Sequence, residues 1–453
     1  MQEPTTPERR EAPDNTGQLK RKKKRVRRRY RRARILLTLL MLVAASSVLI
    51  YMHDDQAPAD FDNAAMKEIG DPDAPVPKIG ADGAEVYCTN LEQPVYQKNA
   101  NKKIDPYSIT KILTGYLAVE NLDLDKVVTI SEHAATPLEN GTTIYLQAGE
   151  KITVRDLLYG AMLESGNDAA TALAEAVSGS EEKFAELMNK QAKEWGCENT
   201  HFVNANGWKN DDHYTTAHDM ALITARSFEN EDLRKITMTE EYVIPATNMS
   251  EARTLVSHTL RGRKVDYMVG GKTGGWTSKD ASLAVAFSKN SIDGSAVVLR
   301  TKSKNRKKEI NKLIGVVQDI TPGYMVTEKG GEVCQARVKG GKKFMTTLCA
   351  DNTITAYPKG YERSGIQVKL KRADLEAPLK AGTEAGTYTV YVDGKKLKSG
   401  TLMTTEDIGK GSFLANYFLP DRAARLIGGI LLAWLALMII LIIAEVRARK
   451  QRI

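Results

Sequence analysis

Residues 106–111 read Pro106, Tyr107, Ser108, Ile109, Thr110 and Lys111, and they open a stretch whose apolar side chains recur with helical spacing. Ser108 and Lys111 are three residues apart, so on a helix they share a face and their side chains can meet. A serine hydroxyl beside an amine is one of the few ways to make a nucleophile without histidine. A lone Ser-x-x-Lys is usually surface polarity, so this pair needs support from the rest of the chain.

Two further polar triplets follow in chain order. Residues 165–167 (Ser-Gly-Asn) fall between two predicted helices, and residues 272–274 (Lys-Thr-Gly) begin a strand region. Singly, the first is usually a turn and the second a strand start. Together with Ser-x-x-Lys, in this order and on these elements, they are far more specific, because the three motifs are the signature of penicillin-binding proteins and class A β-lactamases.

The chain resembles the low-molecular-weight penicillin-binding proteins that act as serine D-Ala-D-Ala carboxypeptidases. Beyond the triplets, the likeness includes residues 157–170, 199–204 and 214–221, and it covers roughly residues 84–320. The resemblance implies an α/β (α+β) serine β-lactamase/transpeptidase-like catalytic domain, which we expect over residues 81–322.

The catalytic roles follow from what amide hydrolysis by a serine requires: a base, a stabilised oxyanion and a proton for the leaving amine. We expect Ser108 to be the nucleophile and Lys111 its base. Burial and the nearby cation Lys272 would lower the pKa of Lys111 toward the neutral amine that a base needs. Ser165 would relay a proton to the leaving D-alanine, and Asn167 would orient Lys111 and the substrate amide.

A second group of residues suits a substrate that ends in a free carboxylate. Lys272 and Thr273 offer a charge and a hydroxyl donor, and Gly274 and Gly275 complete the expected substrate-binding set. The resemblance places the oxyanion hole at the backbone N–H groups of Ser108 and Gly275. The implied partners are a peptidoglycan stem peptide ending in D-Ala-D-Ala and β-lactam antibiotics as covalent inhibitors; no metal or cofactor is expected.

Some positions depart from the family pattern. Ile109 replaces a usual methionine of similar volume, and residues 204–207 (Asn-Ala-Asn-Gly) stand where Asn-Pro-His-Gly is common. The run 274–277 (Gly-Gly-Trp-Thr) is more open than usual, and Trp276 within it either shapes the substrate groove or simply packs. Three histidines lie outside the motifs and are expected at the surface or in packing: His133, His213 and His258.

The positive charge of the chain is concentrated at its N-terminus. Residues 1–34 hold 14 Lys/Arg and 4 Asp/Glu, a net +10, whereas the whole chain has a net +9. Uncharged runs at residues 35–52 and 426–444 are each long enough to cross a bilayer, and basic residues flank both on the side of the chain terminus. The positive-inside rule puts both ends in the cytoplasm and the catalytic domain outside the bacterial cell membrane. Membrane orientation explains the basic run better than nucleic-acid binding does, so no nucleic-acid partner is expected; the first span could instead be a cleaved signal peptide.

The remaining segments complete the expected domain order. Residues 1–34 and 445–453 are predicted as basic cytoplasmic segments, residues 53–80 as a linker, and residues 323–413 as a small all-β, sandwich-like domain. Period-two alternation around an expected Asp293-Gly294 turn predicts a hairpin at the end of the catalytic domain. Cys334 and Cys349 are the plausible disulfide pair among four cysteines, and four unpaired thiols are the alternative.

Two other functions remain open. One is a β-lactamase of the same fold, although the middle triplet is Ser-Gly-Asn and no deacylating glutamate is apparent. The other is a membrane protein that binds wall peptides without turnover, although such a protein has no need of Lys111.

Overall fold

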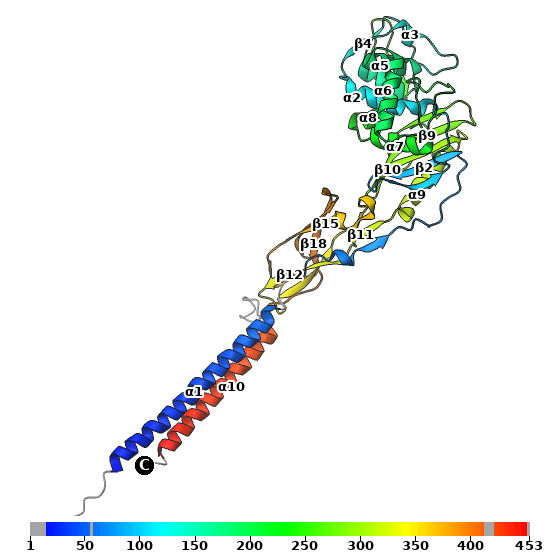
Figure 1. Cartoon of the computed structure of the whole chain (residues 1–453). Coiled ribbons are helices and arrows are strands. Elements are labelled where there is room, and N and C mark those ends of the chain that lie inside the picture. The colour runs from blue at the N-terminus through cyan, green and yellow to red at the C-terminus, as the bar shows by residue number, and fades with distance from the viewer. Residues whose placement is uncertain (1–14, 55–57, 412–420, 451–453) are drawn as a thin grey trace, which may run out of the picture.

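The computed structural model of this 453-residue chain describes residues 15–54, 58–411 and 421–450. The molecule is elongated, with a pair of long helices at one end, a strand-rich unit in the middle and a larger mixed unit at the far end (Figure 1). The order along the chain differs: the mixed unit follows the first long helix, the strand-rich unit comes next, and the second long helix comes last.

The mixed unit is built on a five-stranded antiparallel sheet in the order β3-β2-β10-β9-β8. Its strands are β2 (Gly83–Cys88), β3 (Gln93–Lys98), β8 (Met268–Gly275), β9 (Ala281–Lys289) and β10 (Ile292–Thr301). The order leaves β8 at an edge of the sheet, with one side free of a strand partner. This is the strand that carries the Lys-Thr-Gly motif.

Helices cover both faces of this sheet, which explains why nearly all successive residues of the central strands β9 and β10 are buried. On β9, Leu283 and Val285 belong to one apolar cluster with helix α9 (Arg306–Ile320), whereas Ala284 belongs to a second cluster on the opposite face. That second face is covered by a helical layer. The helices of this layer are α2 (Lys111–Asn121), α4 (Val154–Met162), α5 (Asn167–Ser178), α6 (Glu181–Glu194), α7 (Ala217–Ser227) and α8 (Glu231–Thr237).

Local signals account for several element ends. Thr153 caps α4, because its hydroxyl oxygen accepts a hydrogen bond from the backbone N–H of Asp156 at 3.1 Å. The hairpin of β9 and β10 also forms, but the expected turn at Asp293-Gly294 is wrong. The turn lies at Asn290 and Ser291, both with positive φ, and Gly294 sits inside β10, where a side chain would collide with a backbone oxygen of β2.

Smaller elements complete the mixed unit. They are the 3₁₀ helix η2 (Tyr107–Thr110), α3 (Glu132–Ala135), and two-stranded sheets of β4 (Val127–Thr129) with β5 (Lys151–Thr153) and of β6 (Glu241–Ile244) with β7 (Arg253–Val256).

The strand-rich unit contains two sheets that share one apolar core. A three-stranded sheet joins β1 (Lys67–Ile69), β11 (Gly323–Thr327) and β14 (Ile354–Ala356). A six-stranded sheet has the order β15-β17-β18-β13-β12-β16, formed by β12 (Glu332–Lys339), β13 (Met345–Ala350), β15 (Ile366–Arg372), β16 (Leu375–Glu376), β17 (Glu384–Val392) and β18 (Lys395–Thr404). β1 comes from the stretch predicted as a linker, so part of that stretch is a strand of this unit. All four cysteines are free thiols.

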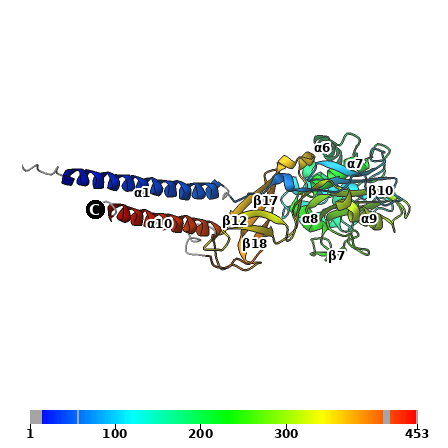
Figure 2. The same cartoon turned by 90° about the horizontal axis from the view of Figure 1, so that it is seen from below.

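The two terminal helices lie side by side and antiparallel in both views (Figures 1 and 2). Helix α1 spans Asn15–Asp54 and α10 spans Asp421–Lys450. Arg34 of α1 forms an ion pair with Glu445 of α10, and the indole N–H of Trp434 donates to the Thr38 hydroxyl at 3.4 Å. By length and composition, Lys20–Leu49 and Arg425–Ala448 are each apolar enough to cross a membrane, and neither stretch is buried by the rest of the chain.

Candidate active site

The first half of the site is the Ser108–Lys111 pair. Ser108 lies in η2 and Lys111 begins α2, and the Lys111 amine lies 3.1 Å from the Ser108 hydroxyl oxygen. The same amine donates to the Asn167 side-chain oxygen and to the Asn206 carbonyl, both at 2.7 Å. Lys111 is fully buried, and burial followed by the charge of Lys272 holds its pKa well below the ordinary value for lysine.

The second half is the pair formed by Lys272 and Ser165. The Lys272 amine donates to the Ser165 hydroxyl at 3.0 Å and to the Thr273 carbonyl at 3.1 Å. Burial, followed by the positive charge of Arg306, lowers the pKa of Lys272 to about 7. Lys111 and Lys272 are 161 positions apart in the sequence, yet both are buried in one site, where each contacts a different serine.

The interhelical triplet is held in a strained turn between α4 and α5. Ser165 has a φ of 64°, a left-handed conformation that non-glycine residues rarely adopt. The Gly166 N–H donates to the Gly160 carbonyl, and the Asn167 N–H donates to the Thr142 carbonyl. These bonds fix the Ser165 hydroxyl and the Asn167 amide toward the two lysines.

Residues 138–149 form an irregular segment along one side of the site, and Asn140, Gly141 and Thr142 within it line the pocket. From inside, the Asp168 carboxylate accepts hydrogen bonds from the backbone N–H groups of Ile144 and Leu146 at 3.1 Å. These bonds tie the segment to the first turn of α5.

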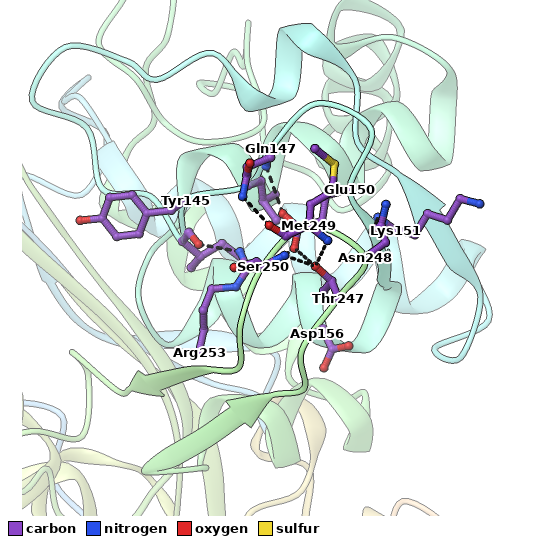
Figure 3. A network of polar contacts seen from close by, with 12 residues as sticks. Tyr145, Gln147, Glu150, Lys151, Asp156, Thr247, Asn248, Met249, Ser250 and Arg253 are labelled. Carbon is purple, nitrogen blue, oxygen red and sulfur yellow. Dashed lines mark hydrogen bonds and ion pairs between the residues drawn. The ribbon is translucent and has the colours of Figure 1, made fainter.

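A polar cluster holds the same segment from outside, as Figure 3 shows. The fully buried Glu150 pairs with Arg253 at the start of β7, and Glu150 also accepts a hydrogen bond from the Thr247 hydroxyl at 2.9 Å. Arg253 in turn donates to the Ile144 carbonyl at 2.8 Å. The connection between β6 and β7 therefore clamps the segment that borders the site.

Glycines let two chain segments approach the backbone at Tyr107 and Ser108 closely. A Cβ atom at Gly274 would lie 3.1 Å from the backbone nitrogen of Ser108 and 2.9 Å from the Pro106 oxygen. A Cβ atom at Gly207 would lie 2.0 Å from the Tyr107 oxygen, and Gly207 has a φ of 81°. The third residue of the Lys-Thr-Gly motif is thus a glycine because the edge of β8 passes directly beside the Ser108 backbone.

These residues line one pocket of about 650 Å³. Of the eight predicted site residues, Ser108, Ser165, Asn167, Thr273, Gly274 and Gly275 line it, and Lys111 and Lys272 are buried beside it through their hydrogen bonds to the two serines. The structure therefore brings the whole predicted set together.

Three basic side chains of the pocket were not among the predicted site residues. Arg306 and Arg261 line the pocket, and so does His258, whose Nε2 lies 3.1 Å from a Glu164 oxygen. The half-exposed side chain of His258 agrees with the expected surface position, but its place at the pocket was not predicted. Arg306 lies in the basic run 302–308, which in the sequence looks like solvent-exposed charge. Only the structure shows that Arg306, at the start of α9, lines the pocket.

The other two histidines fit the expectation. His133 is exposed and contacts Glu175, whereas His213 is buried against Phe202 and bonds the Thr110 hydroxyl at 3.0 Å. Burial lowers the pKa of His213 to about 3, which keeps it neutral. Among the residues that the structure describes, no three His, Cys, Asp or Glu side chains are grouped to hold a metal ion.

A buried lysine amine beside a serine hydroxyl is typical of the class of serine hydrolases and acyl transferases that use lysine in place of histidine. Comparison with known proteins makes this specific. A family model described as D-alanyl-D-alanine carboxypeptidase matches residues 72–303, and one described as the C-terminal domain of penicillin-binding protein 5 matches residues 324–410. The chain belongs to the D-alanyl-D-alanine carboxypeptidase family, which confirms the predicted family and enzyme class.

Individual relatives agree with this assignment. The D-alanyl-D-alanine carboxypeptidase DacF of Bacillus subtilis is 32% identical over 329 residues, covering 71% of this chain and 84% of the relative. DacC of Escherichia coli K12 is 30% identical over 339 residues, covering 70% and 81%. Among solved structures, penicillin binding protein 5 from Haemophilus influenzae is similar with a TM-score of 0.51 and 27% identity, over 74% of this chain and all of that one.

Proposed function

We propose that this serine D-Ala-D-Ala carboxypeptidase removes the terminal D-alanine of peptidoglycan stem peptides through an acyl-enzyme on Ser108. The observation that carries the proposal is the buried Lys111 amine, 3.1 Å from the Ser108 hydroxyl. β-Lactams, which present a strained amide and a carboxylate, would acylate the same serine.

Acylation would begin with Lys111 as a neutral amine. A neutral amine has two N–H donors and one lone pair. Two hydrogen bonds, to Asn167 and to the Asn206 carbonyl, would use both donors and leave the lone pair for the Ser108 proton. As Lys111 takes this proton, the Ser108 oxygen attacks the carbonyl carbon, and the lowered pKa of Lys111 supports this role.

The tetrahedral intermediate would then expel D-alanine. Its oxyanion would accept hydrogen bonds from the backbone N–H groups of Ser108 and Gly275, a role supported by the close approach of β8 to the Ser108 backbone. Ser165, in contact with Lys272, would pass its proton to the leaving nitrogen as the C–N bond breaks and would receive in exchange the proton that Lys111 took from Ser108. Water would afterwards attack the ester, release the shortened peptide and return the proton to Ser108.

Carboxylate recognition would fall to the cationic part of the pocket. Lys272 and Thr273 were expected there, and Arg306 adds a guanidinium that can bind a carboxylate with two parallel hydrogen bonds. Three donors of this kind suit a substrate whose last residue carries a free carboxylate.

For the domain arrangement, we propose a catalytic domain over residues 81–322 and a sandwich-like all-β domain over residues 323–413 that stands it off the membrane. The shared apolar core of the two sheets supports the second domain. The exposed basic stretch of α1 and the basic residues at the end of α10 lie at the same end of the helix pair, away from the strands. This charge distribution supports spans at residues 35–52 and 426–444, with basic termini (residues 1–34 and 445–453) in the cytoplasm.

The main experiment is D-alanine release from a peptide ending in D-Ala-D-Ala, by the full chain and by Ser108→Ala. Release by the first alone is expected. If the wild-type protein is acylated by penicillin but releases no D-alanine, carboxypeptidase activity on this substrate is wrong. Fast turnover of the penicillin itself would instead indicate a β-lactamase. Reporters fused to each terminus, active only in the cytoplasm, test the orientation: activity at both ends is expected.

A further inference from the structure

Three segments beside the pocket carry an excess of positive charge. They are residues 261–266, 277–280 and 302–312, and together they hold ten Lys/Arg and three Asp/Glu, a net +7. Residues 1–34 have a net +10 and the whole chain has a net +9, so the other 419 residues together have a net −1. Within those 419 residues, the +7 of the three segments therefore stands against a net −8 elsewhere.

Hydrogen bonds join the first and third segments into one surface. The buried Lys307 amine donates to the Arg261 carbonyl at 2.7 Å, and the Asn311 amide donates to the Lys264 carbonyl at 3.0 Å. Residues 261–264 therefore lie along the beginning of α9, although about 40 positions separate them from it in the sequence.

The second segment lies at the inner edge of this surface, where it meets the pocket. The Ser303 N–H donates to the Ser278 carbonyl at 2.8 Å, and both serines line the pocket together with Arg261 and Arg306. Beyond this edge lie exposed cations that do not line the pocket, and we call them the outer basic surface: Arg263, Lys264, Lys279, Lys302, Lys304 and Lys308.

The protein's own carboxylates do not neutralise this surface. None of the ten cations forms an ion pair with another residue in the described part of the chain. Of the three carboxylates in the same segments, Asp280 pairs with Arg300, and the buried Glu309 accepts a hydrogen bond from the Gly80 N–H. Clustered like charges repel one another and destabilise a compact fold, so this arrangement favours a ligand that brings the missing negative charge.

The position of the surface indicates which ligand can reach it. The helix pair lies at the opposite end of the molecule, with the strand-rich unit between, so the bilayer around those helices is far from this surface (Figure 1). The surface is continuous with the pocket through Arg261 and Arg306, so a ligand that extends out of the pocket passes over it. Each stem peptide with a D-Ala-D-Ala end carries a free carboxylate, and a polymer that presents many such stems is a polyanion.

We propose that the outer basic surface binds polymeric peptidoglycan through the free carboxylates of stem peptides that neighbour the one in the pocket. This inference rests on the proposed function, because it takes the ligand of the pocket to be a stem peptide. The surface attracts the polymer and holds it while one stem enters the pocket, and it leaves the chemical steps to the two lysines and two serines. The enzyme therefore prefers stems on a polymer to the same stems free in solution.

The test compares two substrates on the full chain in a neutral detergent. One is a soluble, N-acetylated peptide that ends in D-Ala-D-Ala and has no charge besides its terminal carboxylate. The other is purified peptidoglycan with D-Ala-D-Ala ends, freed of phosphate polymers by hydrofluoric acid. Release of D-alanine gives kcat/KM for each, and co-sedimentation with the peptidoglycan measures binding without turnover. The surface variant combines Arg263→Gln, Lys264→Gln, Lys302→Gln and Lys304→Gln.

A matched variant removes four exposed lysines from the strand-rich unit. It combines Lys371→Gln, Lys395→Gln, Lys396→Gln and Lys398→Gln, so it changes the net charge by the same amount at a distance from the pocket. Thermal unfolding checks that both variants keep the fold. Each half of the surface variant, Arg263→Gln with Lys264→Gln and Lys302→Gln with Lys304→Gln, is also measured alone, so the comparison does not depend on a fourfold change.

At about 10 mM salt the surface variant is expected to lose about tenfold in kcat/KM on peptidoglycan, with co-sedimentation reduced and kcat/KM on the soluble peptide within about twofold of wild type. Each half should lose less, and the matched variant should lose nothing. At about 1 M salt, where the Debye length is about 3 Å, wild type and surface variant should converge.

Three results overturn the proposal: no loss on peptidoglycan, an equal loss on both substrates, or a loss on untreated walls that disappears on phosphate-free peptidoglycan. The last would assign the surface to a phosphate polymer instead of stem carboxylates. If wild type releases no D-alanine from either substrate, the proposed function fails by itself. Co-sedimentation then still decides the docking surface, because equal binding by wild type and surface variant excludes it.

Discussion

The amine of Lys111 lies 3.1 Å from the hydroxyl oxygen of Ser108, and the lysine that makes this contact is fully buried. A lysine in water is almost wholly protonated at neutral pH and cannot act as a base. Here burial, followed by the like charge of Lys272, favours the neutral amine. The contact therefore places the proposed nucleophile beside an amine whose surroundings favour the protonation state that the proposed base needs.

Ser108→Ala is expected to abolish labelling by a fluorescent penicillin and D-alanine release, because it removes the only atom that can form the acyl ester in the proposed mechanism. Labelling is read on a gel and D-alanine by a coupled assay. Ser278→Ala is the matched control, since this serine also lines the pocket but lies outside the three motifs. Persistent labelling of Ser108→Ala at another serine would overturn the site assignment.

Lys111→Ala is expected to slow acylation by about 100- to 10,000-fold, the usual contribution of a general base. The remaining acylation rate should no longer show the pH dependence that protonation of Lys111 causes in the wild-type protein. Lys103→Ala provides a control, because that lysine is exposed over the Tyr214 ring. Thermal unfolding of both variants shows whether the fold is kept; wild-type acylation by a folded Lys111→Ala protein would exclude Lys111 as the base.

The pH dependence should report the carboxylate site. With its pKa at about 7, Lys272 loses its positive charge as the pH rises through that value, so kcat/KM for a peptide with a free carboxylate should fall on the alkaline side. Because Arg306 lowers this pKa, Arg306→Gln should raise it and move the alkaline limb to higher pH, while also reducing kcat/KM. The same peptide with an amidated C-terminus should lack this limb. A limb that stays in place in Arg306→Gln would contradict the assignment to Lys272.

The parts of the site that sequence could predict are those held within one motif. Ser108 and Lys111 are three residues apart on one helical face, so their contact follows from helix geometry alone. The Gly274 requirement and the joining of Lys272 to Ser165 could only be inferred from resemblance, because they depend on how β8 packs against η2 and the interhelical turn.

Other parts carried no usable signal. The third hydrogen-bond partner of Lys111 is the Asn206 backbone carbonyl, a group that every residue possesses. In the sequence Arg306 looks like a solvent-exposed cation, and only the position of α9 shows that it lines the pocket.

The fold shows the same division. The helices at 181–194 and 217–227 follow from apolar periodicity. The β9–β10 turn was predicted at the wrong place, because Asp-Gly is a strong turn signal, whereas Gly294 is needed for close packing between strands.

The Glu150–Arg253 pair should set both stability and activity, because it clamps the segment that borders the site. Arg253→Met leaves the fully buried Glu150 carboxylate without its cation, and removing one partner of a buried pair costs about 3–5 kcal/mol. Chemical denaturation measures this loss, and proteolysis within residues 138–149 together with slower penicillin acylation reports release of the segment.

A second variant separates the clamp from simple loss of an arginine. Arg253→Met combined with Glu150→Gln should be less destabilised than Arg253→Met alone, because the unpaired buried charge is gone. Arg155→Met is the surface control: its pair with Asp125 is largely exposed, so the loss should be at most about 1 kcal/mol with unchanged acylation. The clamp would be excluded if Arg253→Met acylated at the wild-type rate and protected residues 138–149 from protease as well as the wild-type protein does. That result would mean that Asp168, which bonds Ile144 and Leu146 from inside, holds the segment without help from the β6–β7 connection.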